Sequence, residues 1–149
     1  METLVRLKGE GVVTVPREAI LTFPEGLVGL ESWHRFVLLE YEDDPVVGLL
    51  QSLDDRDICL FVTDPRNVCP DYSYQLSPGE RAALQLQEDG EVLTLCIMAA
   101  RQEPFELSVN LLGPLAINPR RRLGKQVILA GSAYPARFVL SKAKEDASC

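Results

Sequence analysis

Residues 46–63 read VVGLLQSLDDRDICLFVT, and this stretch decides the fold class. Two apolar runs, Val46–Leu53 and Ile58–Thr63, flank the polar run Asp54–Asp57. Runs of this length that are rich in Val, Leu, Ile and Thr are too short for ordinary helices and are typical of β-strands. Aspartates favour the turn between two strands. The stretch therefore predicts two strands joined by a polar turn.

The same pattern continues on both sides of this pair of strands. Short apolar runs that end at Gly, Pro or acidic residues predict further strands. These are expected at Leu4–Leu7, Val12–Val15, Ile20–Phe23, Phe36–Tyr41, Glu91–Ala100, Glu106–Leu111, Leu115–Asn118 and Gln126–Ala130. The run Glu91–Ala100 is apolar on both faces, which indicates a position in the middle of a sheet.

One helix and one tight turn interrupt the strands. Residues 77–80 read SPGE, in which Ser77 and Glu80 form a capping box around a proline that suits the first helical position. We expect this helix to run to about Leu84 or Leu86. Residues 24–26 read PEG and predict a turn in which the glycine adopts a positive φ.

Many short strands with one short helix predict a mainly β fold, a small antiparallel β-barrel or sandwich-like single domain. A chain of 149 residues with 46% hydrophobic residues suits one domain with one core. We expect the domain to span residues 1–140. Residues 141–149 are polar and charged and are expected to form a flexible C-terminal tail.

The charge balance restricts the classes of partner. Asp and Glu total 22 against 15 Lys and Arg, which gives a formal net charge of −7. An acidic chain is repelled by phosphate backbones and anionic membranes, and it suits a basic partner. A plainer interpretation is that the negative charge only keeps the protein in solution.

The cysteines indicate a reducing environment. Cys59, Cys69, Cys96 and Cys149 include no CxxC pair, and Cys59 and Cys96 lie inside apolar runs as expected of core residues. No apolar leader or membrane-spanning run is present in the sequence. Free thiols without a leader predict a cytoplasmic protein.

The sequence contains no recognisable catalytic or metal-binding motif. His34 is the only histidine, so a three-histidine zinc site is excluded, and no serine or cysteine motif accompanies it. The acidic residues of 54–57 lack the glycine and the closing glutamate of a calcium loop. We therefore expect no enzyme activity, no metal and no cofactor. A small carboxylate-dependent enzyme stays open as an alternative.

One basic cluster offers an alternative function. Arg120, Arg121, Arg122 and Lys125 follow a proline and are typical either of a solvated loop or of a phosphate contact. The alternative hypothesis is an RNA-binding small β-barrel that uses Arg120–Lys125. The acidic net charge and the absence of interleaved aromatic residues favour the solvated loop.

Several segments resemble a known family. Residues 23–31 read FPEGLVGLE, similar to the F-P-x-G-L-x-G-F-E signature of the flagellar assembly factor FliW family, and residues 49–55, LLQSLDD, resemble its L-Q-S-L-x-D segment. Residues 110–118, NLLGPLAIN, resemble its N-L-x-A-P-I-V-I-N motif. The GKQ of residues 124–126 resembles the G-x-Q that follows.

The resemblance extends between these motifs, with a few departures. FVTDP at residues 61–65 and PDY at residues 70–72 resemble the family's F-V-x-x-D-P and D-Y pair. Leu30 replaces an aromatic residue, Gly113 an alanine and Val28 a proline. These departures are consistent with changes in packing. The matches run in order from Phe23 to Gln126.

The resemblance implies a function. FliW proteins are non-enzymatic regulators with a small β-barrel-like fold. They bind the translational repressor CsrA at a surface away from its RNA-binding face and relieve its repression of flagellin synthesis. They also bind flagellin, which titrates them away from CsrA. The expected partners are therefore CsrA and flagellin, with no direct nucleic-acid contact and no membrane contact.

Polar residues inside or beside apolar strands are the candidate partner contacts. The candidates are Gln51, Ser52, Asp55, Asp64, Asp71, Tyr72, Phe105, Asn110 and Asn118. Tyr72 is a possible anchor, and Phe105 follows a proline and is expected to be exposed. Turn chemistry or packing is the alternative role for each. The edge strand Leu4–Lys8 suits pairing with a partner or with a second copy, although a monomer is favoured.

Overall fold

The computed structural model describes the backbone of residues 2–6 and residues 11–41, 44, 46–102 and 104–140. The expected tail, residues 141–149, lies outside the described residues, as do Leu7 and Lys8 of the first expected strand. The strands are β1 (Glu2–Arg6), β2 (Val12–Pro16), β3 (Ile20–Thr22), β4 (Arg35–Glu40), β5 (Val47–Ser52), β6 (Cys59–Thr63), β7 (Leu93–Arg101), β8 (Glu106–Val109), β9 (Leu115–Asn118), β10 (Leu123–Gln126) and β11 (Phe138–Val139). The helices are η1 (Arg17–Ala19), η2 (Pro65–Asn67) and α1 (Pro78–Ala83).

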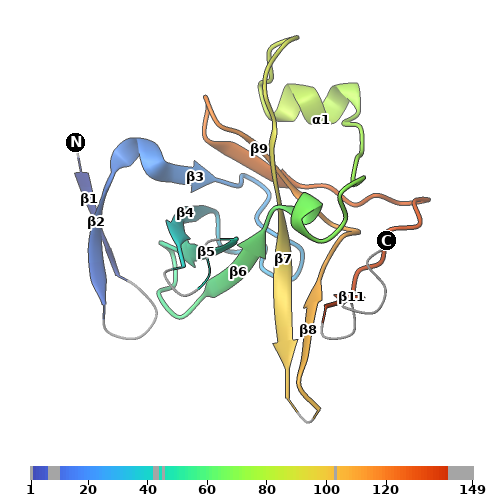
Figure 1. Cartoon of the computed structure of the whole chain (residues 1–149). Coiled ribbons are helices and arrows are strands. Elements are labelled where there is room, and N and C mark those ends of the chain that lie inside the picture. The colour runs from blue at the N-terminus through green and yellow to red at the C-terminus, as the bar shows by residue number, and fades with distance from the viewer. Residues whose placement is uncertain (1, 7–10, 42–43, 45, 103, 141–149) are drawn as a thin grey trace.

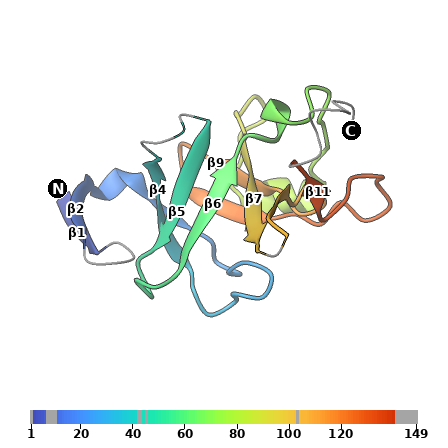
Figure 2. The same ribbon diagram turned by 60° about the horizontal axis from the view of Figure 1, so that its bottom comes forward.

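Seven strands close into a barrel, which confirms the predicted mainly β fold. The ring runs in the order β7, β6, β5, β4, β3, β10 and β9, and β9 pairs back onto β7. All of these pairs are antiparallel except β3 with β10. Figure 2 shows β4, β5 and β6 side by side on one wall. The hairpin of β1 and β2 forms a separate two-stranded sheet (Figure 1).

The long strand β7 belongs to both the barrel and an extension. Its first residues pair with β9 (Leu95 opposite Leu115), and its last residues pair with β8 (Met98 opposite Val109). The loop of residues 110–114 therefore connects two strands that pair one after the other with the same edge of β7. The hairpin of β7 and β8 projects beyond the barrel (Figure 1), and β11 covers the outer edge of β8.

The core has a part inside the barrel and a part outside it. Inside, the rings of Phe23 and Phe36 meet edge to face at a centroid distance of 5.7 Å, surrounded by aliphatic residues such as Leu50. Outside, Tyr72 and Cys96 are buried between β7, β8 and the segment after β6. Side chains of β7 alternate between these parts, so the prediction of a central strand with two apolar faces is confirmed at Leu95 and Cys96.

The expected strand Gln126–Ala130 is wrong. The strand β10 spans Leu123–Gln126. Its sequence, LGKQ, contains a glycine and a lysine and lacks the apolar run that predicts a strand. Val127 and Leu129 only donate backbone hydrogen bonds to the carbonyls of Pro114 and Leu112. The two-residue strand β11 was not predicted, since a strand so short carries no periodicity.

The helix α1 begins at the predicted capping box. Ser77 Oγ accepts from the Glu80 N–H at 3.1 Å, and a Glu80 carboxylate oxygen accepts from the Ser77 N–H at 2.8 Å. The helix ends at Ala83, slightly before the predicted end at about Leu84 or Leu86. The buried Leu84 anchors that end, and the positive φ of 55° at Gln85 turns the chain away.

Gly124 is required by the ring of Phe23. A Cβ at residue 124 would lie 2.4 Å from Phe23 Cε2 and 2.5 Å from Cζ. We expect Gly124→Ala to lower the free energy of unfolding by about 3 kcal/mol, because the buried ring has nowhere to move. Urea denaturation measures the change. Gly79→Ala in α1 is the matched control, since a Cβ there meets nothing closer than 3.9 Å. Equal effects of the two substitutions contradict this explanation.

Candidate partner-binding surface

The turn between β5 and β6 is built around Gln51. Its side chain is 1% exposed, and the two N–H groups of its Nε2 are shared among the carbonyls of Ser52, Arg56 and Ile58, at N···O distances of 3.0 to 3.2 Å. Ser52 Oγ accepts from the N–H groups of Asp54 and Asp55 at 3.0 Å. The predicted contact residues Gln51, Ser52 and Asp55 therefore lie together in one turn. Gln51 and Ser52 shape this turn from the interior, and their role in partner binding stays a prediction.

Asp54 fastens the same turn to the start of β4. Its Oδ2 accepts from the N–H groups of His34 and Arg35 at 2.8 and 3.0 Å, and its Oδ1 accepts from the Arg35 guanidinium. Burial acts to raise the Asp54 pKa, but these hydrogen bonds and the Arg35 charge outweigh it, so the pKa is lowered. The side chain of the only histidine, His34, lies beside the Phe23 carbonyl, with Nδ1 at 3.1 Å from its oxygen.

Three of the motif segments meet at Gln126. Its Oε1 accepts from the Val28 N–H at 2.8 Å, and its Nε2 donates to the Gly113 carbonyl at 2.9 Å. Asn110 Oδ1 accepts from the N–H of Gly113 at 2.9 Å, and Lys125 forms an ion pair with Glu25. Asn110, a predicted contact, is half-buried here. Sequence reasoning quoted Gln126 in a motif but did not recognise that it joins distant segments.

Tyr72 is the centre of the apolar cluster outside the barrel. It is buried, its hydroxyl donates to the Leu111 carbonyl at 2.6 Å, and its ring packs against Tyr134 at a centroid distance of 4.4 Å. Tyr72 therefore supports the surface from below instead of lying on it. Burial raises its pKa, and burial also raises the pKa of the neighbouring Cys96 thiol to about 12.

The expectation that the cysteines are free thiols holds for only part of the set. Cys96 is a buried free thiol, whereas Cys69 is disulfide-bonded. Cys69 is also buried in the cluster of Tyr72, at 1% exposure. Sequence spacing could not reveal this, because a disulfide depends on which cysteines the fold brings together.

The buried Tyr72 and Cys96 predict a loss of stability at alkaline pH. Both groups have a pKa raised by folding, so the stability they contribute is complete below their unfolded pKa values, about 10 and about 9. It is lost as the pH rises from there toward the folded values. We expect the melting temperature to fall above about pH 9. The melting temperature of the Tyr72→Phe variant should fall less steeply with pH, because the variant lacks the phenol. Identical slopes for the two proteins contradict this assignment.

Asn118 ties the loop after β9 to the end of α1. Its Nδ2 donates to the carbonyls of Leu84 and Gln85 at 2.8 and 3.2 Å, and its Oδ1 accepts from the N–H groups of Arg120 and Arg121. The side chain is 4% exposed. Asn118 is thus a structural clamp in the interior, and its predicted contact with a partner stays a prediction.

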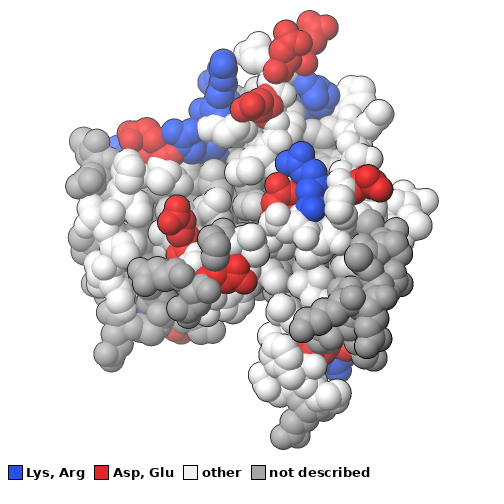
Figure 3. Space-filling view, in the orientation of Figure 1, with Lys and Arg blue, Asp and Glu red and all other residues white. Residues whose placement is uncertain are grey.

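The basic cluster is divided by the fold. Lys125 is 2.8 Å from a Glu25 oxygen, and the Arg122 guanidinium donates to the carbonyl of Pro119. Arg120 and Arg121 line a hollow that Asp89 and Glu91 also line. Figure 3 shows the same mixture at larger scale, with basic side chains next to acidic ones over the face displayed. The cluster therefore does not form a continuous basic stripe.

The remaining predicted contacts lie at separate places. Asp64 caps η2 by accepting from the Arg66 N–H at 2.9 Å and pairs with the Arg66 guanidinium. Asp71 is exposed next to Tyr72. Phe105 is 58% exposed at the tip of the β7–β8 hairpin, as predicted. The nine predicted residues therefore do not form one surface.

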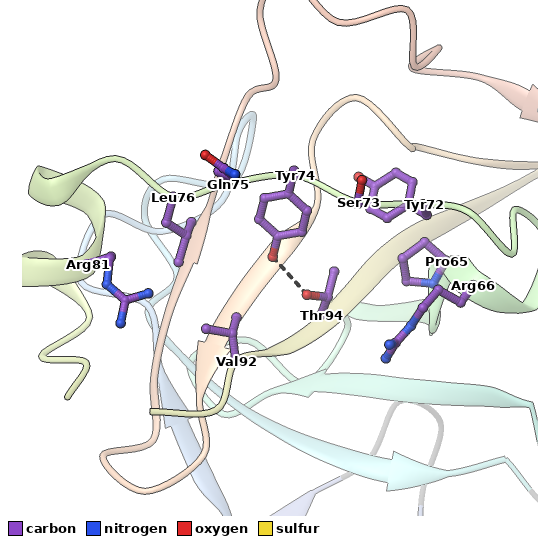
Figure 4. Close-up of a pocket in the computed structure, with 10 residues that line it drawn as sticks. All are labelled: Pro65, Arg66, Tyr72, Ser73, Tyr74, Gln75, Leu76, Arg81, Val92 and Thr94. Carbon is purple, nitrogen blue, oxygen red and sulfur yellow. Dashed lines mark hydrogen bonds between the residues drawn. The ribbon is translucent and has the colours of Figure 1, made fainter. Parts of the chain in front are cut away.

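A groove of about 430 Å³ lies between the extended segment Ser73–Leu76 and the start of β7. Figure 4 shows Tyr74 and Thr94 facing each other across it, joined by a hydrogen bond of 2.8 Å between their hydroxyl oxygens. Arg81 of α1 and Arg66 of η2 stand on opposite sides of Val92 (Figure 4). We call this site the tyrosine–arginine groove.

The tyrosine–arginine groove holds two guanidinium groups, of which only that of Arg81 lies outside the described ion pairs. Arg66 forms an ion pair with Asp64, with 3.2 Å between Nη2 and Oδ2. Arg81 donates to the carbonyls of Gln87 and Glu88 at 2.8 and 3.3 Å, and among the described ion pairs none involves Arg81. Sequence reasoning missed both arginines, because single arginines after a proline or inside a helix carry no pattern.

Two features are absent from the residues that the structure describes. Among them, no group of three or more His, Cys, Asp or Glu side chains is placed to hold a metal ion. Over the same residues, no helix has the length and apolar character needed to cross a bilayer.

Comparison with known proteins places the chain in a family. The family model described as "FliW protein" matches residues 5–140. A flagellar assembly factor FliW from Natranaerobius thermophilus is 36% identical over 131 residues, covering 87% of each chain. One from Geobacter sulfurreducens is 35% identical over 127 residues, covering 85% of this chain and 79% of the relative.

A solved structure agrees with these sequence matches. The crystal structure of a flagellar assembly factor FliW superposes with a TM-score of 0.84 at 27% sequence identity, covering 94% of this chain and 99% of the other. The closed barrel, the motif segments that meet at Gln126 and these matches agree with one another. The chain belongs to the FliW family of flagellar assembly factors.

Proposed function

We propose that this protein is a non-enzymatic regulator that binds the translational repressor CsrA, relieves its repression of flagellin synthesis, and binds flagellin in competition with CsrA. The observation that carries the proposal is the match of the FliW family over residues 5–140, which includes every motif segment. The protein acts as a monomer in the cytoplasm, where translation takes place. It needs no metal or cofactor for this role.

The charge of the chain supports CsrA as a partner. CsrA binds RNA and therefore carries positive charge, and a net charge of −7 steers an acidic protein toward it. The exposed Asp71 and Phe105 and the half-buried Asp55 and Asp64 are the proposed contacts, at separate places on the surface. Gln51, Ser52, Tyr72, Asn110 and Asn118 contribute by holding the surface in shape, since their polar atoms are engaged in internal hydrogen bonds.

The test uses purified CsrA bound to a fluorescent RNA that carries its recognition sequence. Adding this protein should release the RNA, and adding monomeric flagellin should restore the CsrA–RNA complex. The association rate with CsrA should fall roughly tenfold between about 50 mM and about 500 mM salt, because exposed charges are screened. Failure to release RNA, or release that flagellin does not reverse, contradicts the proposal.

The RNA-binding alternative is tested by the basic cluster. The pairing of Lys125 with Glu25 and the acidic residues beside Arg120 and Arg121 argue against it. The double variant Arg120→Gln, Arg121→Gln keeps the loop, because Asn118 binds only the backbone N–H groups of these residues. We expect unchanged binding to CsrA and no RNA binding by either protein. RNA binding that the double variant abolishes would establish the alternative.

A further inference from the structure

The strand β7 has an open edge where β6 ends. The last residue pair of β6 and β7 is Thr63 opposite Cys96. Continuing the ladder would bring Pro65 opposite Thr94, but a proline has no N–H to donate and the chain turns into η2 at Pro65. The sheet therefore stops on this side of β7 while β7 itself extends back to Leu93.

The backbone groups of this edge point into the tyrosine–arginine groove. The Ile97 carbonyl accepts from Asn110, so Ile97 faces the edge occupied by β8 and β9. Because successive residues of a strand face opposite edges, Leu95 and Leu93 face β9, whereas Thr94 faces the other edge and Val92 directly precedes the strand. Among the described backbone groups, none is hydrogen-bonded to Thr94 on that edge or to Val92 before the strand. Both residues line the groove.

The walls of the groove fit an extended chain that carries carboxylates. Ser73–Leu76 runs beside the open edge, and the Tyr74 ring and the Val92 side chain supply apolar contacts. Arg66 and Arg81 flank Val92 (Figure 4), so one bound strand passes between two guanidinium groups. Guanidinium groups bind carboxylates through strong, charge-assisted hydrogen bonds.

We propose that the tyrosine–arginine groove binds an extended acidic segment of a partner protein, which adds as a strand to the open edge of β7 at Thr94 and places its carboxylates on Arg66 and Arg81. Strand addition supplies affinity through backbone hydrogen bonds, and the two arginines select acidic side chains. The site differs in charge preference from the acidic surface proposed for CsrA. It therefore adds a second mode of partner binding to the proposed function.

The test uses a fluorescein-labelled peptide, Glu-Val-Thr-Val-Thr-Val-Glu, and fluorescence anisotropy with the whole protein. We expect saturable binding of this peptide, and binding about tenfold weaker when both glutamates are replaced by lysine. Two further peptides carry N-methyl groups on every second residue. The first is methylated at the odd positions and the second at the even positions, so each has the N–H groups of a different edge blocked. One of them should lose binding and the other should keep it, because a strand pairs through a single edge.

Protein variants locate the peptide and separate this proposal from the function above. Arg66→Gln and Arg81→Gln should each weaken peptide binding about tenfold, whereas Arg120→Gln, a matched control at another exposed loop, should not. Circular dichroism and urea denaturation check that each variant is folded. The proposal is overturned if the peptide does not bind, if the lysine peptide binds equally, or if both N-methylated peptides bind like the parent. Release of RNA from CsrA by the same variants reports on the proposed function independently.

Discussion

Phe23→Ala is expected to lower the free energy of unfolding by about 4 kcal/mol, within the range for burying and then deleting a large aromatic side chain. The Phe23 ring is 0% exposed, packs edge to face on Phe36, and lies against the backbone at Gly124. Gly124 has no side chain that could move into the vacated space, so the surrounding residues can fill little of it. Equilibrium denaturation in urea measures the loss.

Phe105→Ala is the matched control for Phe23→Ala. Both substitutions remove the same atoms, but the Phe105 ring is 58% exposed at the tip of the β7–β8 hairpin. We expect Phe105→Ala to change stability by less than about 0.5 kcal/mol. If Phe23→Ala costs no more than Phe105→Ala, the barrel interior described here is wrong.

Gln51→Glu is expected to lower the free energy of unfolding by about 3 kcal/mol at neutral pH, because it places a buried carboxylate against three carbonyl oxygens. The substitution keeps the shape of the side chain and removes its N–H donors. Protonation of the carboxyl group relieves the repulsion, so part of the loss should be recovered as the pH falls toward about 5.

A second variant separates the charge from the lost hydrogen bonds. Gln51→Leu removes the donors without adding a charge, so we expect a smaller loss of about 2 kcal/mol that does not depend on pH. Urea denaturation at several pH values measures both variants. A Gln51→Glu loss that is equal at all pH values, or no loss for either variant, shows that the Gln51 side chain does not hold the turn.

The sequence predicted the fold well where the apolar pattern is local. The β5–β6 hairpin and the α1 capping box are both specified by neighbouring residues, and both formed where expected. The sequence failed at β10, where Gly124 and Lys125 serve packing and an ion pair with segments a hundred residues away. From local sequence alone, a glycine and a lysine indicate a loop, because their contacts are with residues far away in the sequence.

The candidate site was less predictable for the same reason. The sequence predicts polar residues in apolar strands either as partner contacts or as structural residues. In the structure, Gln51 and Asn118 use their amides to satisfy internal carbonyls, and their role in partner binding stays a prediction. Arg66 and Arg81 are brought to one groove only by the closure of the barrel and the placement of α1. Local patterns reveal strands and caps, whereas a binding groove depends on contacts between segments that no local pattern encodes.

The central claim is that this protein works by binding a translational repressor and flagellin. The most direct measurement is capture of partners from a cell extract on the immobilised full chain, with the bound proteins identified by mass spectrometry. We expect a CsrA protein and flagellin among the captured proteins, with added flagellin reducing the amount of CsrA retained. Recovery of neither a CsrA protein nor flagellin contradicts the account.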